Sequence, residues 1–173
     1  MILYLLRHGS TEGSGRANPS LSPDGRNAAL KAGNLIFSAG GRLDSVFASP
    51  LARSVETARL IAGVAGGVVT VVESLEPEGN ELETLQILAS CGKERAAVVG
   101  HLPQLRRMVS ALISDAHPLS MHLDPGCPVC IEADFTTGQW SCTMLWATDV
   151  ELMRHMSFQA GPDAGSAGRK GDK

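Results

Sequence analysis

Short apolar runs alternate with longer segments of helical periodicity along most of this chain. Runs that predict strands lie at residues 2–6, 45–48, 68–72 and 96–99, and apolar side chains recur at helical spacing after each run. A chain that alternates strands and helices in this way builds a mostly parallel sheet with helices on both of its faces. We therefore expect an α/β fold with a three-layer α/β/α sandwich.

Helix-start signals follow the predicted strands. Ser22 and Pro23 predict a helix cap and a proline in the first turn, and this helix is expected to end near Gly40. Ser49-Pro50 predicts the start of a second helix. Its buried stripe is predicted to consist of four apolar side chains, Leu51, Val55, Ala58 and Ala62. Further helices are expected around residues 82–88 and 105–112, and one or two edge strands are expected within 119–146.

Length and composition favour a single domain. The chain has 173 residues, of which 43% are hydrophobic and 19% are charged, so it can bury a core without a second domain. We expect the folded domain to span residues 1–158. Residues 159–173 lack apolar content and are expected to form a disordered tail.

Charge and hydropathy exclude some classes of function. A net charge of −3 argues against a general nucleic-acid binder, whose surface carries a basic excess. The apolar opening is too short for a signal-peptide core, and no uncharged stretch reaches the length of a membrane span. We expect a cytoplasmic protein with neither a nucleic-acid nor a membrane partner.

Basic side chains stand where the predicted strands end. Arg7 and His8 follow the first strand, Arg53 lies in the first turn of the helix after the second strand, and His101 follows the strand at 96–99. The carboxyl ends of parallel strands meet at one edge of a sheet, where ligands of open α/β folds bind. We therefore expect these four residues, named here the basic quartet, to converge.

Such a convergence suits a dianionic phosphoryl group. Arginine offers a rigid fork of donors that matches phosphate oxygens, and helix amino termini add backbone donors. A neutral histidine can attack phosphorus and leave a phosphoramidate that water later cleaves. Arginines and a second, cationic histidine can neutralise the equatorial oxygens, so we expect neither a metal nor another cofactor.

The residues of the quartet also carry a family resemblance. Leu6-Arg7-His8-Gly9 resembles the RHG signature of the histidine phosphatase superfamily, which includes the phosphoglycerate mutases. The stretch from Ser49 to Ala58 (SPLARSVETA) and Val99-Gly100-His101 resemble the second and third motifs of that family. The short length and His101-Leu102-Pro103 look most like the compact SixA-type phosphohistidine phosphatases.

This resemblance implies a fold and a set of roles. The fold is expected to be phosphoglycerate mutase-like, with residues 1–158 as the catalytic domain. His8 would be the nucleophile, and Arg7, Arg53 and His101 would hold the transferred phosphoryl group. Many family members have a glutamate after RHG and an asparagine a few residues later, whereas this chain has Ser10 and Ser14.

Other candidate residues lie in the loops beside the quartet. Ser10 and Thr11 are candidate phosphate donors, although turn-forming hydroxyls need no function. A general acid that protonates an alcohol leaving group is not fixed by spacing; the candidates are Glu76 and Glu78, after the third strand, with Glu12 as a third.

These observations predict a phosphatase that works through a phosphohistidine intermediate on His8. A site without a dedicated acid favours the weak P–N bond of phosphohistidine, so the expected partner is a phosphorylated protein. A phosphomonoesterase for a small phosphorylated metabolite is the alternative within the family. A non-catalytic phosphate- or phosphoprotein-binding module is the alternative outside enzymes. The sequence does not indicate an oligomeric state.

Two further groups of residues are candidates for a function. His117, His122, Cys127 and Cys130 have a spacing that superficially suits zinc, but prolines interrupt the segment and we interpret it as structural. Three arginines are interpreted as surface charges on helices: Arg59, Arg106 and Arg107.

Overall fold

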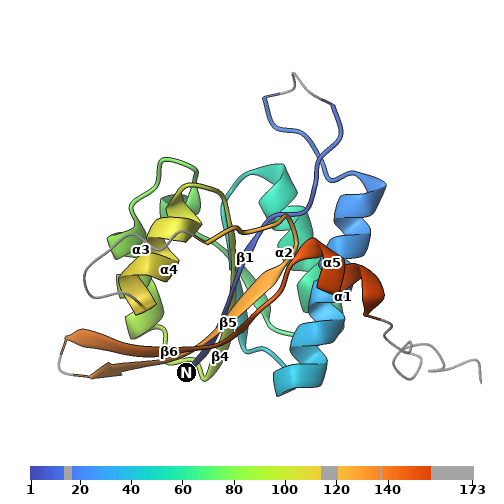
Figure 1. Ribbon diagram of the computed structural model, residues 1–173. Helices are drawn as coiled ribbons and strands as arrows, with labels where there is room; N and C mark the ends of the chain where they lie inside the picture. The colour runs from blue at the N-terminus through green and yellow to red at the C-terminus, as the bar shows by residue number, and fades with distance from the viewer. Residues whose placement is uncertain (14–16, 114–120, 137, 157–173) are drawn as a thin grey trace, which may run out of the picture.

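A six-stranded sheet runs through the centre of the molecule (Figure 1). The computed structural model describes residues 1–13, 17–113, 121–136 and 138–156. The strands are β1 (Ile2–Arg7), β2 (Ser45–Ala48), β3 (Val68–Val71), β4 (Arg95–Gly100), β5 (Pro128–Thr136) and β6 (Gln139–Ala147). Their order is β3-β2-β4-β1-β5-β6, in which β1 to β4 are parallel, β5 is antiparallel to β1, and β6 is antiparallel to β5.

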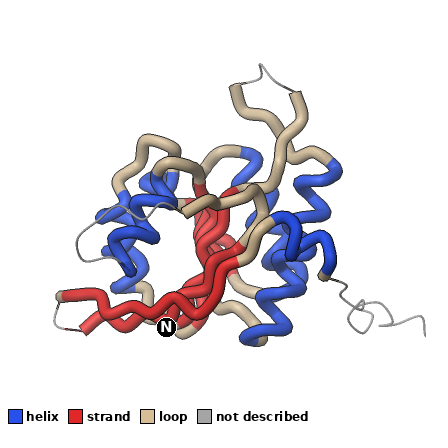
Figure 2. The backbone as a smooth tube through the Cα atoms, in the orientation of Figure 1, coloured by secondary structure: helices blue, strands red, loops and turns tan. Residues whose placement is uncertain are grey.

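Helices cover both faces of this sheet, as Figures 1 and 2 show. On one face lie α1 (Pro23–Gly40), α2 (Ala52–Ala65) and α5 (Val150–His155), and on the other lie α3 (Glu81–Ser90) and α4 (Gln104–Ile113). A short 3₁₀ helix, η1 (Glu73–Leu75), precedes α3. The predicted three-layer α/β/α sandwich is confirmed. None of the helices in the described ranges combines the length and apolarity that a membrane span needs.

The two halves of the core follow from the alternation of side chains along β1. Leu3 and Leu5 pack in the cluster beneath α3 and α4, whereas Tyr4 and Leu6 pack in the cluster beneath α1 and α2. All four side chains are at most 2% exposed. A strand needs an uninterrupted apolar run when both faces of its sheet are covered. The burial of β1 fixes the polar residues that follow it at the carboxyl end of the strand.

The start of α1 agrees with its sequence signals, whereas the buried face of α2 does not. Ser22 Oγ accepts a hydrogen bond from the Gly25 amide at 3.0 Å, as expected of a helix cap. Helix α2 begins only at Ala52, and three residues of its predicted stripe are partly exposed: Leu51, Val55 and Ala62. The residues buried instead are Ser54, Thr57, Ala58, Ile61 and Ala65. Burial of Ser54 and Thr57 is tolerated because both hydroxyls have hydrogen-bond partners.

The C-terminal part of the domain contains one element that the sequence analysis missed. Segment 119–146 gives two strands, of which only β6 lies at the sheet edge, because β5 is paired on both sides. Helix α5 was not predicted; Asp149 caps it by accepting a hydrogen bond from the Leu152 amide at 2.7 Å. The expected tail at 159–173 lies outside the described residues, so the domain boundary stays a prediction.

Candidate functional site

The carboxyl ends of three neighbouring parallel strands form one rim of the sheet. Strands β2, β4 and β1 are adjacent in that order, so the residues that follow them emerge together. Backbone hydrogen bonds continue past the strand ends, from the His8 amide to the Gly100 carbonyl and from the Ser49 amide to the Val99 carbonyl, both at 3.1 Å. In Figure 1 the loop after β1 projects beyond this rim. The rim is therefore a fixed platform for the side chains above it.

Arg53 joins the two histidines of the basic quartet. Its Nε donates to His8 Nε2 at 3.1 Å, and its Nη2 lies 3.4 Å from His101 Nδ1. The two imidazole rings are 4.8 Å apart between centroids. Arg7 adds its positive charge, which lowers the pKa of His8, Arg53 and His101. The convergence expected from the sequence is thus present, although the catalytic roles of the four residues stay predictions.

His8 is held as a neutral imidazole whose Nε2 lone pair accepts a hydrogen bond from Arg53. Its Nδ1 lies 2.7 Å from the Gly9 carbonyl, which can only accept, while Nε2 faces a guanidinium, which can only donate. The partners therefore assign the proton to Nδ1 and the lone pair to Nε2. Burial lowers the pKa of His8 to about 4, and the charges of Arg53 and Arg7 add to this against the Gly9 hydrogen bond. At pH 7 the ring is neutral, which a nucleophilic nitrogen requires.

His101 is buried and, like His8, neutral at pH 7. It is 3% exposed, and burial lowers its pKa to about 3, with further lowering by His8, Arg53 and Arg7. The expectation of a cationic second histidine concerns the site with a phosphoryl group bound, and it stays a prediction. Burial is the largest cause of the lowered pKa of His101, and the neighbouring His8, Arg53 and Arg7 lower it further, so a nearby anion would favour protonation.

Thr57 fixes the loop after β1 to helix α2, a role that sequence reasoning did not assign. The Gly9 amide donates to Thr57 Oγ1 at 3.1 Å, and Thr57 Oγ1 donates to the Arg53 carbonyl at 2.7 Å. Thr57 thereby ties the residue after the nucleophile to the backbone of the arginine. The signal was in the second motif, where a hydroxyl stands one helical turn after Arg53.

Two other polar residues hold the same loop against α2 and were also missed. Asn18 Oδ1 accepts from the Ala52 amide at 2.9 Å, so a loop side chain caps the start of the helix that carries Arg53. Glu56 accepts from the Leu21 amide at 2.9 Å and forms an ion pair with Arg26. Neither backbone contact is readable from sequence spacing, because the partners lie 34 and 35 residues apart, with α1 and β2 between them.

Ser10 and Thr11 lie in the loop beside the quartet. Ser10 is exposed, and its carbonyl accepts from the Ser22 amide at 2.9 Å; Thr11 forms an isolated β-bridge with Leu21. Glycine is required at position 25, because a Cβ there would overlap the Ser10 backbone. The structure describes backbone contacts for both residues, so a role of their hydroxyls in binding phosphate stays a prediction.

The candidate acids Glu76 and Glu78 lie on a tight turn at the same rim, after β3 and η1. We name residues 74–79 the 74–79 turn. The Gly79 amide donates to the Glu76 carbonyl at 2.8 Å, and Glu78 is exposed. In the described part of the chain, the hydrogen bonds of His8, Arg53 and His101 involve neither carboxylate. A role of either carboxylate as the general acid stays a prediction.

Helix α4 holds the 74–79 turn in place. The side-chain amide of Gln104, which is fully buried, donates to the Ser74 carbonyl, and Arg107 Nη2 donates to the Gly79 carbonyl at 3.2 Å. Arg107 also forms an ion pair with Glu81 at 2.9 Å. Arg107 is a surface charge, as interpreted from the sequence, with its side chain 41% exposed, but it also binds the end of the turn.

Replacing Gly79 by alanine is expected to destabilise the protein by about 1–3 kcal/mol, because the added Cβ would overlap the Ser74 backbone. The matched control is Gly63→Ala in α2. That position has open space around it, so the change is expected to stabilise the protein by about 1 kcal/mol through helix propensity. Urea unfolding of both variants measures the difference, and equal stabilities would contradict this account of the turn.

The segment with the zinc-like spacing is only partly described. His117 lies outside the described residues, while His122 is exposed and its Nε2 lies 2.8 Å from Asp124 Oδ1. Cys127 and Cys130 are buried, and burial raises the pKa of these thiols to about 12 and about 11. Within the described ranges, no three His, Cys, Asp or Glu side chains are grouped as metal ligands.

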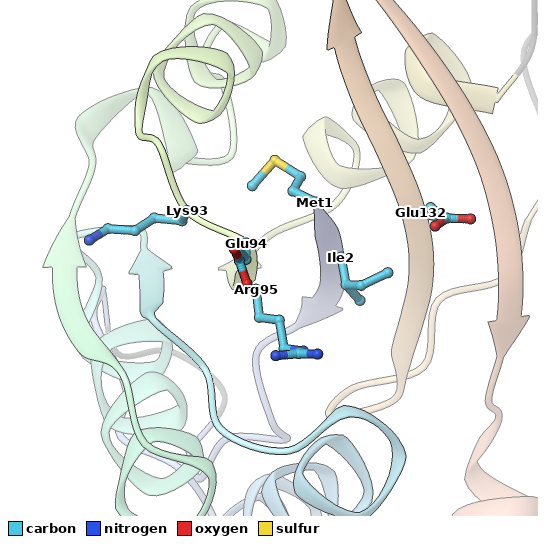
Figure 3. A pocket seen from close by; sticks show the side chains of 6 residues that line it. All are labelled: Met1, Ile2, Lys93, Glu94, Arg95 and Glu132. Atoms are coloured by element: carbon cyan, nitrogen blue, oxygen red, sulfur yellow. The ribbon is translucent and has the colours of Figure 1, made fainter.

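A hollow of about 340 Å³ lies at the opposite end of the sheet, between the amino ends of β1 and β4 (Figure 3). Its lining mixes positive side chains, Lys93 and Arg95, with negative ones, Glu94 and Glu132. Because β1 and β4 are parallel, this hollow is separated from the basic quartet by the length of both strands. It is not part of the candidate site.

Comparisons with known proteins bear on the family and on the fold. Residues 3–78 match the family model of the histidine phosphatase superfamily (branch 1). No curated protein matches the sequence. Among solved structures, the protein histidine phosphatase SixA complexed with tungstate is 20% identical, with a TM-score of 0.72 over 85% of this chain and 96% of that one.

Two further solved structures share the fold. A putative phosphohistidine phosphatase SixA from Nakamurella multipartitia is 24% identical, with a TM-score of 0.71 over 86% of this chain and 95% of that one. A phosphoserine phosphatase from Entamoeba histolytica is 17% identical, with a TM-score of 0.64 over 84% and 95% of the two chains. The phosphoglycerate mutase-like fold is confirmed. The family match covers residues 3–78, so this part of the chain is similar to the histidine phosphatase superfamily, while the solved structures show the fold that the chain shares with them.

Proposed function

We propose that this protein is a phosphatase in which His8 Nε2 attacks the phosphorus atom of the substrate. In the first step an N–P bond forms, the bond from phosphorus to the leaving group breaks, and the leaving group takes up a proton from solvent as it departs. In the second step water attacks phosphorus, the N–P bond breaks, and inorganic phosphate leaves a neutral His8. The guanidinium groups of Arg7 and Arg53 neutralise the charge of the transferred group in both steps, which is why the proposal needs no metal.

The observation that carries the proposal is the position of Arg53 between the two histidines. Its Nε–H points at the lone pair of His8 and its Nη2 lies beside His101. A phosphoryl group attacked by His8 would lie where the arginine can donate to its equatorial oxygens. Tungstate, a tetrahedral oxyanion, is bound in the solved SixA structure of the same fold, which supports an oxyanion site in this chain.

Phosphohistidine in a protein is the proposed substrate. The P–N bond is weak enough to break without a dedicated acid. His8 would perform the attack, and its hydrogen bonds in the described part of the chain involve no carboxylate. The two SixA structures named above have the same compact architecture. The partner would then be a phosphorylated protein. A location in the cytoplasm stays a prediction from the sequence.

A small phosphorylated metabolite is the second candidate substrate, and one feature favours it. A hollow of about 340 Å³ borders Ser10, with Asp24, Lys31, Asp124 and Arg154 also in its lining. Ser10 is close in sequence to His8, and Pro125, also in the lining, pairs with Arg7. Such a space could take the rest of a small substrate. Phosphoserine phosphatase and a putative α-ribazole-5′-P phosphatase from Escherichia coli share the fold.

Rapid mixing of the enzyme with an aryl phosphate, followed by chemical quench, tests the proposal. We expect phosphate on His8 that is labile in acid and stable in base, detected by mass spectrometry of the peptide that contains residue 8. A protein that binds phosphate and never becomes phosphorylated would be a binding module, contrary to the proposal. Rates on a phosphohistidine protein against a panel of sugar, serine and nucleotide phosphates then separate the two substrate classes.

A further inference from the structure

Two buried serine hydroxyls contact the same nitrogen of His101. Ser49 Oγ lies 2.9 Å from His101 Nε2, and Ser54 Oγ lies 3.1 Å from it. Ser49 follows β2, Ser54 stands in the first turn of α2, and both are fully buried. Hydroxyls in a buried site are fixed by their partners, so this pair belongs to the environment of His101 and not to the solvent.

The partners of His101 assign its two nitrogens different states. Arg53 can only donate, so the contact of its Nη2 with Nδ1 requires a lone pair on Nδ1. The proton of the neutral ring is then on Nε2, which donates to the serine hydroxyls. Ser49 Oγ also accepts from the Leu51 amide at 3.3 Å, which holds this hydroxyl in place. The unprotonated nitrogen therefore faces Arg53 and His8, the side on which a phosphoryl group would bind.

We propose that Ser49 and Ser54 are positioning residues that hold His101 in the tautomer able to take up a proton on Nδ1 when a phosphoryl dianion binds. This proposal rests on the proposed function, because it requires a tetrahedral anion between the arginines and the histidines. Nδ1 is the only nitrogen of the His101 ring without a proton, so a proton from solvent enters there, stays on Nδ1, and the new N–H donates a hydrogen bond to an oxygen of the anion. The Nε2–H bond to the serines is kept before and after.

The charges around His101 make protonation conditional on the anion. Burial disfavours a positive charge on the ring most, and His8, Arg53 and Arg7 disfavour it further. A dianion reverses the sign of the local field and favours imidazolium. Because the serines satisfy Nε2–H in both states, the ring does not have to rotate when the anion enters. The site is thereby organised in advance for the charge it must stabilise.

Sulfate is the probe for this test, because it is a tetrahedral dianion throughout the neutral range and carries no titratable proton. Calorimetric titrations in buffers of different ionisation enthalpy should show proton uptake when sulfate binds to the wild-type protein at pH 7.5. The ¹⁵N signal of His101 Nδ1 should move from its unprotonated to its protonated position. Neither measurement depends on turnover, whereas trapping phosphate on His8 tests the proposed function separately.

Ser54→Ala is expected to weaken sulfate binding about threefold, because Ser49 still accepts from His101 Nε2. The double variant Ser49→Ala/Ser54→Ala is expected to weaken it about tenfold or more. The pair should also reduce proton uptake and populate the other tautomer in the ¹⁵N spectrum. Ser54→Thr keeps the hydroxyl and should restore the wild-type values, while Ser38→Ala, at an exposed position of α1, is the control.

Unchanged proton uptake and an unchanged Nδ1 signal in Ser54→Ala and in the pair would overturn the proposal. The single variant and the threonine variant keep the test decisive if the pair does not fold. Proton uptake that vanishes in His101→Gln but not in the serine variants would also overturn it, since the serines would then have no part in it.

Discussion

Replacing His8 by alanine is expected to lower kcat/KM for an aryl phosphate and for a phosphohistidine protein by on the order of 10⁴-fold or more, as loss of a catalytic nucleophile does. His8 Nε2 carries the lone pair in the structure, and burial with the charges of Arg53 and Arg7 keeps the ring neutral. No other described nitrogen of the quartet combines partial exposure with a lone pair, because His101 is buried. Quenched-flow assays should find no acid-labile phosphate on the variant.

Binding of inorganic phosphate distinguishes a nucleophile from a binding residue. His8 is neutral and adds no positive charge, so His8→Ala should bind phosphate within a few-fold of wild type by calorimetry. His155→Ala, at an exposed histidine of α5, is the matched control and should leave kcat/KM unchanged. A His8→Ala protein that turns over substrate at the wild-type rate, or that still becomes phosphorylated, would reject the mechanism.

The part of the site that the sequence predicted is the part fixed by strand ends. Arg7, His8 and His101 follow apolar runs that are buried on both faces, so the positions of these residues are set by topology and not by loop geometry. Arg53 was predictable for a related reason. It lies in the first turn of the helix that follows β2, so its position relative to the end of that strand can vary little. The order of the strands then brings the four together.

The contacts that orient these side chains could not be predicted in the same way. The sequence predicted a buried face of α2 made of apolar residues. The helix instead buries Ser54 and Thr57 as well, because each hydroxyl has a hydrogen-bond partner near the site. A polar residue inside a helix carries no signal of its burial until its partner is known. Asn18 and Arg107 were missed for the same reason, since the backbone groups they bind belong to distant segments.

Removing the guanidinium of Arg53 is expected to lower kcat/KM for both substrate classes by about 10²–10³-fold, the usual effect of losing one preorganised donor to the transition state. Both the formation and the hydrolysis of phospho-His8 should slow in single-turnover assays, because the arginine binds the group that is common to the two steps. The variant is Arg53→Met, and Arg59→Met, at an exposed position of the same helix, is its control.

The same variant is expected to raise the pKa of His8. In the wild-type protein burial is the largest cause of the lowered pKa, and the charge of Arg53 lowers it further, so the pKa should move up from about 4 without reaching its ordinary value. The free enzyme would then lose its neutral nucleophile at a higher pH, and the acid limb of kcat/KM should shift upward. NMR titration of the His8 ring separates this shift from ionisation of the substrate.

Arg53→Lys separates the charge of the arginine from its geometry. Lysine keeps the positive charge beside His8 but lacks the rigid fork that matches phosphate oxygens. We therefore expect the His8 pKa to stay close to its wild-type value while kcat/KM falls between wild type and Arg53→Met. If lysine restored the full rate, the arginine would act only as a point charge, and its contact with both His8 and His101 would not matter for catalysis. A lysine variant with low activity and an unchanged His8 pKa would show instead that the geometry of the arginine matters. The loss would then come from the hydrogen bonds by which Arg53 holds the phosphoryl group between the two histidine rings.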